Sequence, residues 1–289
     1  MAQTVASHRS PESVPPVPAP MFPANAIDAH VHLVGSDYVL SPKAVETPPE
    51  GALNHWLSRY RRHLADMGCT RGVIVHSILY GTDNSITLDA VASMGEGFVA
   101  VVLVPDDVSD AELDRLADAG ARAVRLNYVH GGVLTWEGAK ALAPRLAARG
   151  LHIEMLAHSH LHLAELAPDV RRMPCPVVFD HCAWPDATLG TDDPGHRALC
   201  RLLADGHAYT KLSAPHRWSA NRDEARAIRG SLLAANPERC LWGSDWPHLM
   251  LGGVAVPDAL AQRDDLLAQM TAGEARQVFV DTPSALYRI

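Results

Sequence analysis

The sequence predicts a distorted (β/α)8 barrel, an α/β fold built as a single domain. Eight short apolar segments alternate with longer amphipathic ones between residues 26 and 244, as expected for parallel strands joined by right-handed helical crossovers. The length of 289 residues suits one such barrel, which commonly spans about 250 residues. Hydrophobic residues make up 47% of the chain, enough for a sizeable core.

The expected elements follow one another in a regular order. Residues 1–25 are rich in Pro, Ser and Ala without periodicity, which predicts an extended arm before a barrel domain at 26–289. The predicted strands are Ala26–Leu33, Gly72–Ser77, Phe98–Val104, Ala123–Asn127, His152–Leu156, Val177–His181, Ala208–Ser213 and Cys240–Ser244. Helices are expected at 51–67, 84–94, 109–119, 137–149, 160–167, 194–205, 222–235, 258–270 and 273–279, several opening on a capping residue such as Asn84, Ser109 or Thr135.

A doubly wound open sheet is the competing architecture. Such sheets usually carry a Gly-rich phosphate turn after the first strand. Here the first strand runs into Val31-His32-Leu33-Val34-Gly35, which does not match that turn. The barrel is therefore the favoured fold.

Charge, cysteine content and hydropathy narrow the classes of partner and location that we expect for the protein. A formal charge of -8 without a basic block argues against a nucleic-acid partner. Five scattered cysteines without a Cys-x-x-Cys pair are typical of a reducing compartment. The chain shows neither a signal-peptide pattern nor an apolar run near the roughly 20 residues of a membrane span. We expect a cytoplasmic protein with a small-molecule substrate and no membrane partner, and homo-oligomer formation stays open.

Polar residues stand where the predicted strands end. Barrel enzymes keep their catalytic groups at the C-terminal ends of strands. Packing alone does not explain so complete a ring, which predicts an active site at this end of the barrel. In strand order, its members are His30, His32, Arg125, Asn127, Glu154, His158, His181, Lys211, Ser213, Arg217 and Asp245.

His30 and His32 are alternate residues of the first strand, so their imidazoles face one side. They could chelate one metal, grip one carbonyl, or be neutral core histidines bonded to the backbone. Zinc accepts imidazole and carboxylate ligands and keeps one position for water. His30, His32, His158 and Asp245 would provide that set, with His158 its weakest member because two more histidines follow at 160 and 162.

His181 and Asp245 each admit more than one role. His181 could be a metal ligand, a proton shuttle, a donor to a substrate oxygen, or a buried structural residue. Asp245 fits a general base that takes a proton from the attacking water. It could instead cap a following helix, an option that Pro247 keeps open.

Arginines form the third part of the predicted site. Arg125 and Arg217 stand at strand ends, where a guanidinium can bind a carboxylate with two hydrogen bonds or join a salt bridge within the barrel mouth. The remaining residues expected to contact the substrate are Asn127, Tyr128, His130 and Tyr80.

Several motifs together resemble the amidohydrolase superfamily. Within it they resemble the branch that contains lactonases of 2-pyrone-4,6-dicarboxylate and of sugar acids. The resemblance covers the chain from Ala26 onward and implies a β/α barrel that hydrolyses a lactone ring. The motifs are Ile27-Asp28-Ala29-His30-Val31-His32, Gly81-Thr82-Asp83-Asn84, Val124-Arg125-Leu126-Asn127, Phe179-Asp180-His181 and Trp242-Gly243-Ser244-Asp245-Trp246-Pro247-His248.

The resemblance also implies roles for individual residues. The aspartate after the eighth strand, Asp245 here, would activate water. The His-x-His pair and the histidine after the sixth strand, here His30, His32 and His181, would polarise the lactone carbonyl, and Arg125 and Arg217 would bind carboxylates. Some members work without metal and relatives hold zinc, so one divalent ion, zinc before others, and a metal-free site both stay open. The bridging lysine of binuclear relatives is absent here.

The chain departs from the pyrone-dicarboxylate pattern in three places. Where that pattern has a second arginine, this sequence reads His130-Gly131-Gly132, and its two tyrosines are missing near Ala157 and at Glu46. We therefore expect a lactone of a carboxylated or polyhydroxylated molecule with one acidic group at most. The alternatives are a zinc-dependent decarboxylase of a small aromatic or unsaturated acid and a non-catalytic barrel that binds a small acid.

Overall fold

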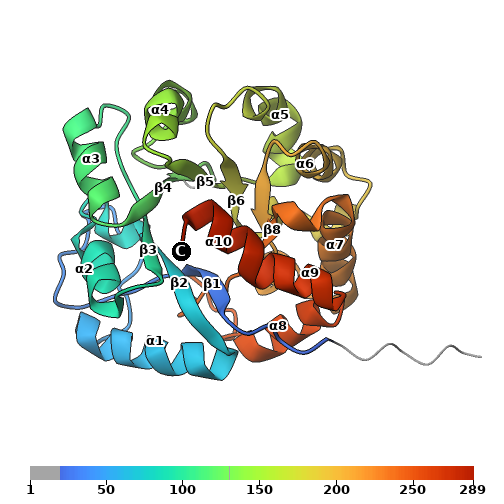
Figure 1. The fold of residues 1–289 in the computed structure, drawn as a ribbon, viewed down its shortest axis with the longest axis horizontal. Helices are drawn as coiled ribbons and strands as arrows, with labels where there is room; N and C mark the ends of the chain where they lie inside the picture. Colours follow the sequence, from blue (N-terminus) through green and yellow to red (C-terminus); the bar gives the residue numbers. More distant parts are fainter. Residues whose placement is uncertain (1–19, 130) are drawn as a thin grey trace, which may run out of the picture.

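Eight parallel strands form the centre of the molecule, in a computed structural model that describes residues 20–129 and 131–289 (Figure 1). The sheet runs in sequence order from β1 to β8, with helices wrapped around it, and the predicted barrel is confirmed. Most of the predicted 1–25 arm and His130 lie outside the described residues. The strands are β1 (Ala26–Val31), β2 (Cys69–Val75), β3 (Phe98–Val102), β4 (Ala121–Asn127), β5 (His152–Leu156), β6 (Val177–Phe179), β7 (Tyr209–Lys211) and β8 (Cys240–Leu241).

Helices follow the strands close to where the periodicity predicted them. A π-helical turn, η2 (Ser159–Leu163), precedes α5, and a second one, η7 (Gln277–Asp281), joins the last two helices. The prediction stopped at 279 and missed the final helix. The α-helices are α1 (Leu53–Met67), α2 (Ser85–Met94), α3 (Asp110–Asp118), α4 (Trp136–Ala148), α5 (Ala164–Val170), α6 (Pro194–Ala204), α7 (Arg222–Ala235), α8 (Ala259–Leu267), α9 (Ala272–Arg276) and α10 (Thr282–Tyr287).

Two of the three predicted helix caps are confirmed. The side chains of Ser109 and Thr135 accept hydrogen bonds from backbone N–H groups in the first turns of α3 and α4. Asn84 precedes α2 but makes no side-chain cap. Its amide instead accepts from Leu103 N and donates to Leu103 O, both at 2.8 Å, and so ties α2 to the end of β3.

The seam between β1 and the segment after β8 closes the barrel. Ala29 N donates to Trp242 O at 3.0 Å, and Asp245 N donates to His30 O at 2.8 Å. A Cβ on Gly243 would lie 2.4 Å from His30 N, so only glycine allows this approach. Asp28 adds a polar clasp, because its carboxylate accepts from Ser244 N at 2.7 Å and from Ser244 Oγ at 2.6 Å.

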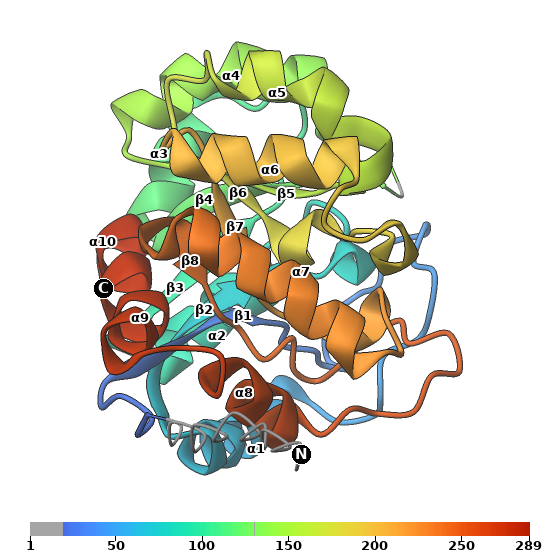
Figure 2. The same cartoon turned by 90° about the vertical axis from the view of Figure 1, so that its right-hand side faces the viewer.

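An inner apolar cluster fills the end of the barrel opposite the long loops. It joins residues of β1, β2, β3, β4, β6 and β8 to the fully buried Tyr287 of α10. Figure 2 shows α10 at one end of the barrel and the loops after β1 and β8 at the other. None of the described helices has both the length and the apolar character needed to cross a bilayer.

Candidate active site

A cavity of about 580 Å³ opens among the loops that follow the strands. Its wall includes predicted site residues from five different strand ends, together with apolar side chains. Barrel enzymes bind substrates at this end. The lining residues are His32, Val45, Glu46, Ile78, Arg125, Asn127, Leu156, His181, Trp184, Arg217, Asp245, Met250 and Gly252.

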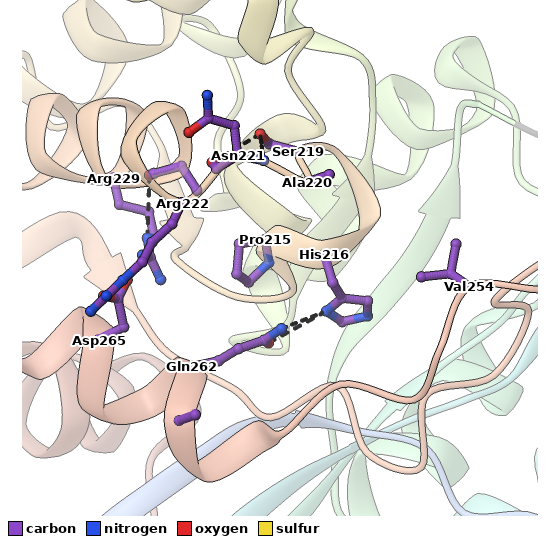
Figure 3. A pocket seen from close by; sticks show the side chains of 12 residues that line it. Pro215, His216, Ser219, Ala220, Asn221, Arg222, Arg229, Val254, Gln262 and Asp265 are labelled. Atoms are coloured by element: carbon purple, nitrogen blue, oxygen red, sulfur yellow. Dashed lines mark hydrogen bonds and ion pairs between the residues drawn. The ribbon is translucent and has the colours of Figure 1, made fainter.

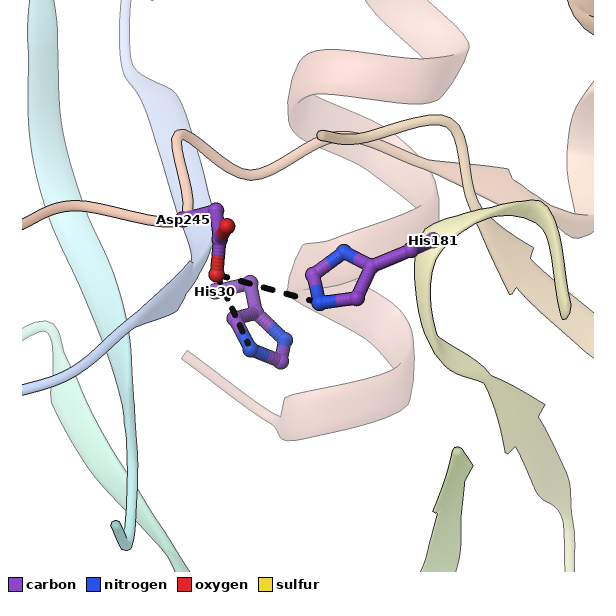
Figure 4. Close-up of side chains that lie close together, drawn as sticks. All are labelled: His30, His181 and Asp245. Atoms are coloured by element: carbon purple, nitrogen blue, oxygen red, sulfur yellow. Dashed lines mark ion pairs between the residues drawn. The ribbon is translucent and has the colours of Figure 1, made fainter. Parts of the chain in front are cut away.

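Three imidazoles converge on one oxygen of Asp245. Its Oδ1 lies 3.7 Å from His181 Nε2, 3.9 Å from His30 Nε2 and 4.0 Å from His32 Nε2. Figure 4 shows His30 and His181 both directed at this oxygen, one from below it and one from the side. Oδ1 is buried and has no hydrogen-bond partner among the described residues, so its lone pairs are open to a ligand.

The proton of His32 has a fixed position. His32 Nδ1 lies 2.7 Å from Val75 O, a carbonyl that can only accept, so Nδ1 carries the hydrogen. Burial, with Arg125 nearby, lowers the pKa of His32 well below its usual value, and the ring is neutral. Its Nε2 therefore presents a lone pair, 3.3 Å from His30 Nε2.

Unusual backbone conformations place these side chains. Asp245 and His181 have φ values of 61° and 52°, and Ala214, just beyond β7, has 49°. Such left-handed residues cost about 1–3 kcal/mol each and cluster at functional sites. β6, β7 and β8 each end before the predicted strand ends at His181, Ser213 and Ser244.

Arg217 sets the charge state and orientation of Asp245. Its Nε–H donates to Asp245 Oδ2 at 2.6 Å, and its NH2 group donates to Leu249 O at 2.9 Å. Burial alone would raise the pKa of Asp245, but Arg217 foremost, with the nearby imidazoles, holds it far below the usual range. Asp245 is thus a buried, ionised carboxylate.

Arg125 offers hydrogen-bond capacity within the cavity. It is only 4% exposed, and its NH1 group donates to His76 O at 2.7 Å. Its Nε–H is buried and has no partner among the described residues. A buried guanidinium with an unpaired donor suits an anionic substrate group.

A buried ion cluster lies beneath the histidines. Lys211 Nζ donates to Glu154 Oε2 at 2.5 Å and lies 3.2 Å from Asp180 Oδ1, and all three residues are fully buried. Burial would raise the pKa values of both carboxyls, but Lys211 lowers them, so both are ionised. Tyr287 donates its hydroxyl hydrogen to Glu154.

The donor atoms fit a divalent metal. His30, His181 and Asp245 each offer a ligand atom, all within 4.8 Å of one another. Two nitrogens on one tetrahedral zinc, each at about 2.0–2.1 Å, lie roughly 3.3–3.4 Å apart. The Nε2 atoms of His30 and His32 are separated by 3.3 Å. His216 and His248 form a further candidate group with Asp245, on the side of Oδ2 that Arg217 occupies.

Several predicted residues lie elsewhere. His158 does not join any metal-capable group of described residues, and its Nδ1 lies 3.2 Å from Trp184 O. Tyr80 is buried, where its hydroxyl exchanges hydrogen bonds with the backbone of Gly35. Tyr128 packs edge-on against His162. Neither tyrosine lines the cavity.

Two further residues of the site were given no role from the sequence. Glu46 lines the cavity and accepts a hydrogen bond from Met250 N at 2.8 Å, which joins two loops at the mouth. Ser213 Oγ lies 2.8 Å from His181 Nδ1. The strand-end ring included Ser213, and Glu46 stood out only as a departure from the lactonase pattern.

A second cavity, of about 530 Å³, lies between the segment before α7 and α8 (Figure 3). It shares no lining residue with the first cavity. His216 and Gln262 hydrogen-bond within it, and Arg222 and Arg229 pair with Asp265. Its charged groups are thus paired among themselves.

Comparisons agree with this architecture. The amidohydrolase family model matches residues 27–289. A 2-pyrone-4,6-dicarboxylate hydrolase of Comamonas testosteroni is 32% identical, over 94% of this chain and 93% of its own. A 4-sulfomuconolactone hydrolase of Hydrogenophaga intermedia is 29% identical, over 92% and 90%.

A solved structure of a putative 2-pyrone-4,6-dicarboxylic acid hydrolase from Pseudomonas putida superposes with a TM-score of 0.77 and 29% identity, covering 91% of this chain and 97% of that one. The resemblance drawn from the motifs, including the lactonase branch, is confirmed. Since the family model spans nearly the whole chain, this protein belongs to the amidohydrolase family.

Proposed function

We propose that this protein is a hydrolase that opens the ring of a small lactone bearing one anionic group. One observation carries the proposal: an ionised Asp245 oxygen, without a hydrogen-bond partner among the described residues, faces three imidazoles beside the cavity that Arg125 lines. A carboxylate in this position can accept a proton from water while the imidazoles surround the reacting carbonyl. The lactone-hydrolase names of two relatives support the same chemistry.

Asp245 is the general base in this scheme. Its Oδ1 takes a proton from water as the water oxygen attacks the lactone carbonyl. The ring C–O bond then breaks, and Asp245 returns the proton to the leaving alkoxide. An N–H of His181 or His30 directed at the carbonyl oxygen can stabilise the oxyanion and lower the barrier by several kcal/mol, whereas Nε2 of His32 presents a lone pair and can orient His30.

The site residues can also hold a divalent ion, for which zinc is the first candidate. His30, His32, His181 and Asp245 would be its ligands, in place of the predicted His158. When bound, the ion would polarise the lactone carbonyl and acidify water. Arg217 keeps Asp245 oriented in either case.

Charge in the cavity limits the substrate. Arg125 has a buried Nε–H without a partner among the described residues, whereas Arg217 already binds Asp245 through Nε and Leu249 through NH2. Glu46 puts a carboxylate in the cavity wall near the mouth. We infer one anionic group bound at Arg125, with hydroxyl or other neutral groups toward Glu46.

A lactone panel, assayed on purified protein with and without a chelator, tests the proposal. Ring opening without carbon loss is expected for a mono-anionic lactone, and Asp245→Asn should lower kcat by about 10²–10⁴-fold. Asp265→Asn, which alters a carboxylate of the second cavity, is the matched control and should keep activity. Release of carbon dioxide would identify a decarboxylase, and inactivity on the whole panel would favour a binding barrel.

A further inference from the structure

Nδ1 of His30 meets two groups of opposite hydrogen-bonding character. Lys211 Nζ lies 3.1 Å away and can only donate. Asp180 Oδ1 lies 3.2 Å away, and a carboxylate oxygen can only accept. All three side chains are fully buried, so water does not compete for these contacts.

A neutral imidazole can use only one of these partners at a time. If Nδ1 accepts from Lys211, the ring hydrogen sits on Nε2 and can be donated to the lone pair of His32 Nε2 at 3.3 Å. If Nδ1 carries the hydrogen, it donates to Asp180, and the two Nε2 lone pairs face each other. That second arrangement is repulsive unless a cation lies between the lone pairs.

The structure matches the first arrangement. Lys211 to His30, His30 to His32 and His32 to Val75 O form a continuous chain in which each donor has an acceptor. Both oxygens of Asp180 are buried and accept no hydrogen bond of good geometry from any residue in the described part of the chain. Asp180 is thus a buried acceptor beside Nδ1 that is not used in the first arrangement.

Lys211 cannot easily leave this position. Glu154 Oε2 binds its ammonium at 2.5 Å, and Tyr287 in turn donates to Glu154. His30, Glu154 and Asp180 could hold a metal ion by the spacing of their ligand atoms. The Lys211 ammonium contacts one atom of each of these three residues and so occupies the place of that ion. A metal ion can therefore bind His30 only through Nε2.

We propose that Lys211 and Asp180 are positioning residues that let His30 exchange between two tautomers without moving its ring. With no ion present, Lys211 donates to Nδ1 and the hydrogen sits on Nε2. When a divalent ion binds at Nε2, the single ring hydrogen moves from Nε2 to Nδ1 and is donated to Asp180, so no proton is gained or lost overall and the ring keeps its charge. The inference uses the proposed function only in treating His30 as a site residue.

Nitrogen-15 NMR of the histidine rings in the full chain tests the inference directly. In chelator-treated wild-type protein, His30 should carry its hydrogen on Nε2, and after zinc is added it should carry it on Nδ1. His32 should keep its hydrogen on Nδ1 throughout and is the internal control. A His30 that already has its hydrogen on Nδ1 before zinc is added, or that keeps it on Nε2 afterwards, would overturn the inference.

Two variants act in opposite directions. Lys211→Met removes the donor that favours Nε2–H, so zinc should bind at least about tenfold more tightly, whereas Asp180→Asn weakens the acceptor and should cost about 10–100-fold in zinc affinity. Lys211→Arg keeps a donor and should retain the wild-type tautomer. Equal losses of affinity in Lys211→Met and Asp180→Asn would show a merely structural role.

The wild-type NMR experiment keeps the test decisive if Lys211→Met does not fold, and Lys211→Met with Glu154→Gln removes two opposite charges together. None of these readouts uses catalysis. An inactive lactone panel would therefore refute the proposed function and leave the tautomer result standing, and the reverse also holds.

Discussion

Arg217 is bonded to Asp245 through Nε and Oδ2 at 2.6 Å, which leaves Oδ1 as the oxygen that faces the imidazoles. The guanidinium was expected to bind substrate, and it does line the cavity. Its direct partner, however, is the carboxylate that we propose as the base. The two arginines of the site therefore differ in their contacts. Arg217 binds the proposed base, whereas Arg125 has a buried Nε–H without a partner among the described residues.

Exchanging each arginine for methionine should distinguish a role in orienting the base from a role in binding the substrate. Arg217→Met should mainly lower kcat, because Asp245 loses the partner that orients and ionises it. Arg125→Met should mainly raise KM. Each effect should be about 10–100-fold, since a hydrogen bond to a charged group contributes about 1.5–3 kcal/mol. Steady-state kinetics on the best substrate checks this, and the reverse pattern would contradict the assignment.

Glu46 should select against substrates with a second negative charge. Glu46→Gln removes the charge at the mouth, so KM for lactones with two carboxylates should fall while kcat for mono-anionic lactones stays the same. Glu50→Gln changes an exposed residue of the same loop that does not line the cavity, and is the control. An unchanged substrate preference in Glu46→Gln would exclude this role.

The pH profile should show no limb from His32 or His181. Burial lowers the pKa of His181 to about 3, and that of His32 also falls well below its usual value. Asp245, its pKa depressed by Arg217, stays ionised as pH falls. We expect kcat/KM to stay level between about pH 5 and 7.5, where unperturbed histidines titrate near 6.5. A steep loss of activity centred near 6.5, with the fold intact by circular dichroism, would be inconsistent with these charge states.

Gly243→Ala should destabilise the seam. The added Cβ would lie 2.4 Å from the backbone nitrogen of His30, a clash with the backbone that rotating a side chain cannot relieve. A loss of about 1–3 kcal/mol or more in the free energy of unfolding is expected from urea titration. Gly230→Ala in α7 is the matched control, because its Cβ would find nothing closer than 3.8 Å. The control should be neutral or slightly stabilising.

Tyr287→Phe tests the hydrogen bond from Tyr287 to the buried ion cluster of Lys211, Glu154 and Asp180. It removes the buried hydroxyl that donates to Glu154, so the free energy of unfolding should fall by about 1–3 kcal/mol. Tyr38→Phe removes a hydroxyl that donates to Asp89 at the surface, and should change it far less. Equal effects of the two substitutions would mean that the buried contact adds no special stability.

The strands and most helices could be predicted because apolar periodicity is local information. The same reasoning fails where the backbone becomes unusual. His181 adopts a left-handed conformation that apolar patterns do not reveal, and the predicted sixth strand ran through it, whereas β6 ends at Phe179. The last helix follows a π-helical turn, and its start could not be distinguished from a continuing α9.

The predicted strand ends indicated which residues would lie near the candidate site, but not which of them would contact one another. His30, His32, His181 and Asp245 meet as expected. Which of several histidines after β5 reaches the centre depends on the η2 turn, and the structure leaves His158 against Trp184 O. The partners of Arg217 and Lys211 depend on packing between strands, which one sequence does not encode locally.

The polar clasp between Asp28 and Ser244 has a consequence for recovery from denaturant. His30 and His32 lie on one side of that junction and Asp245 on the other. A chain with β2 to β7 paired but this junction open would have its secondary structure and still be catalytically silent. In refolding experiments, the return of enzyme activity should therefore report closure of the barrel, whereas circular dichroism would report the earlier assembly of strands and helices.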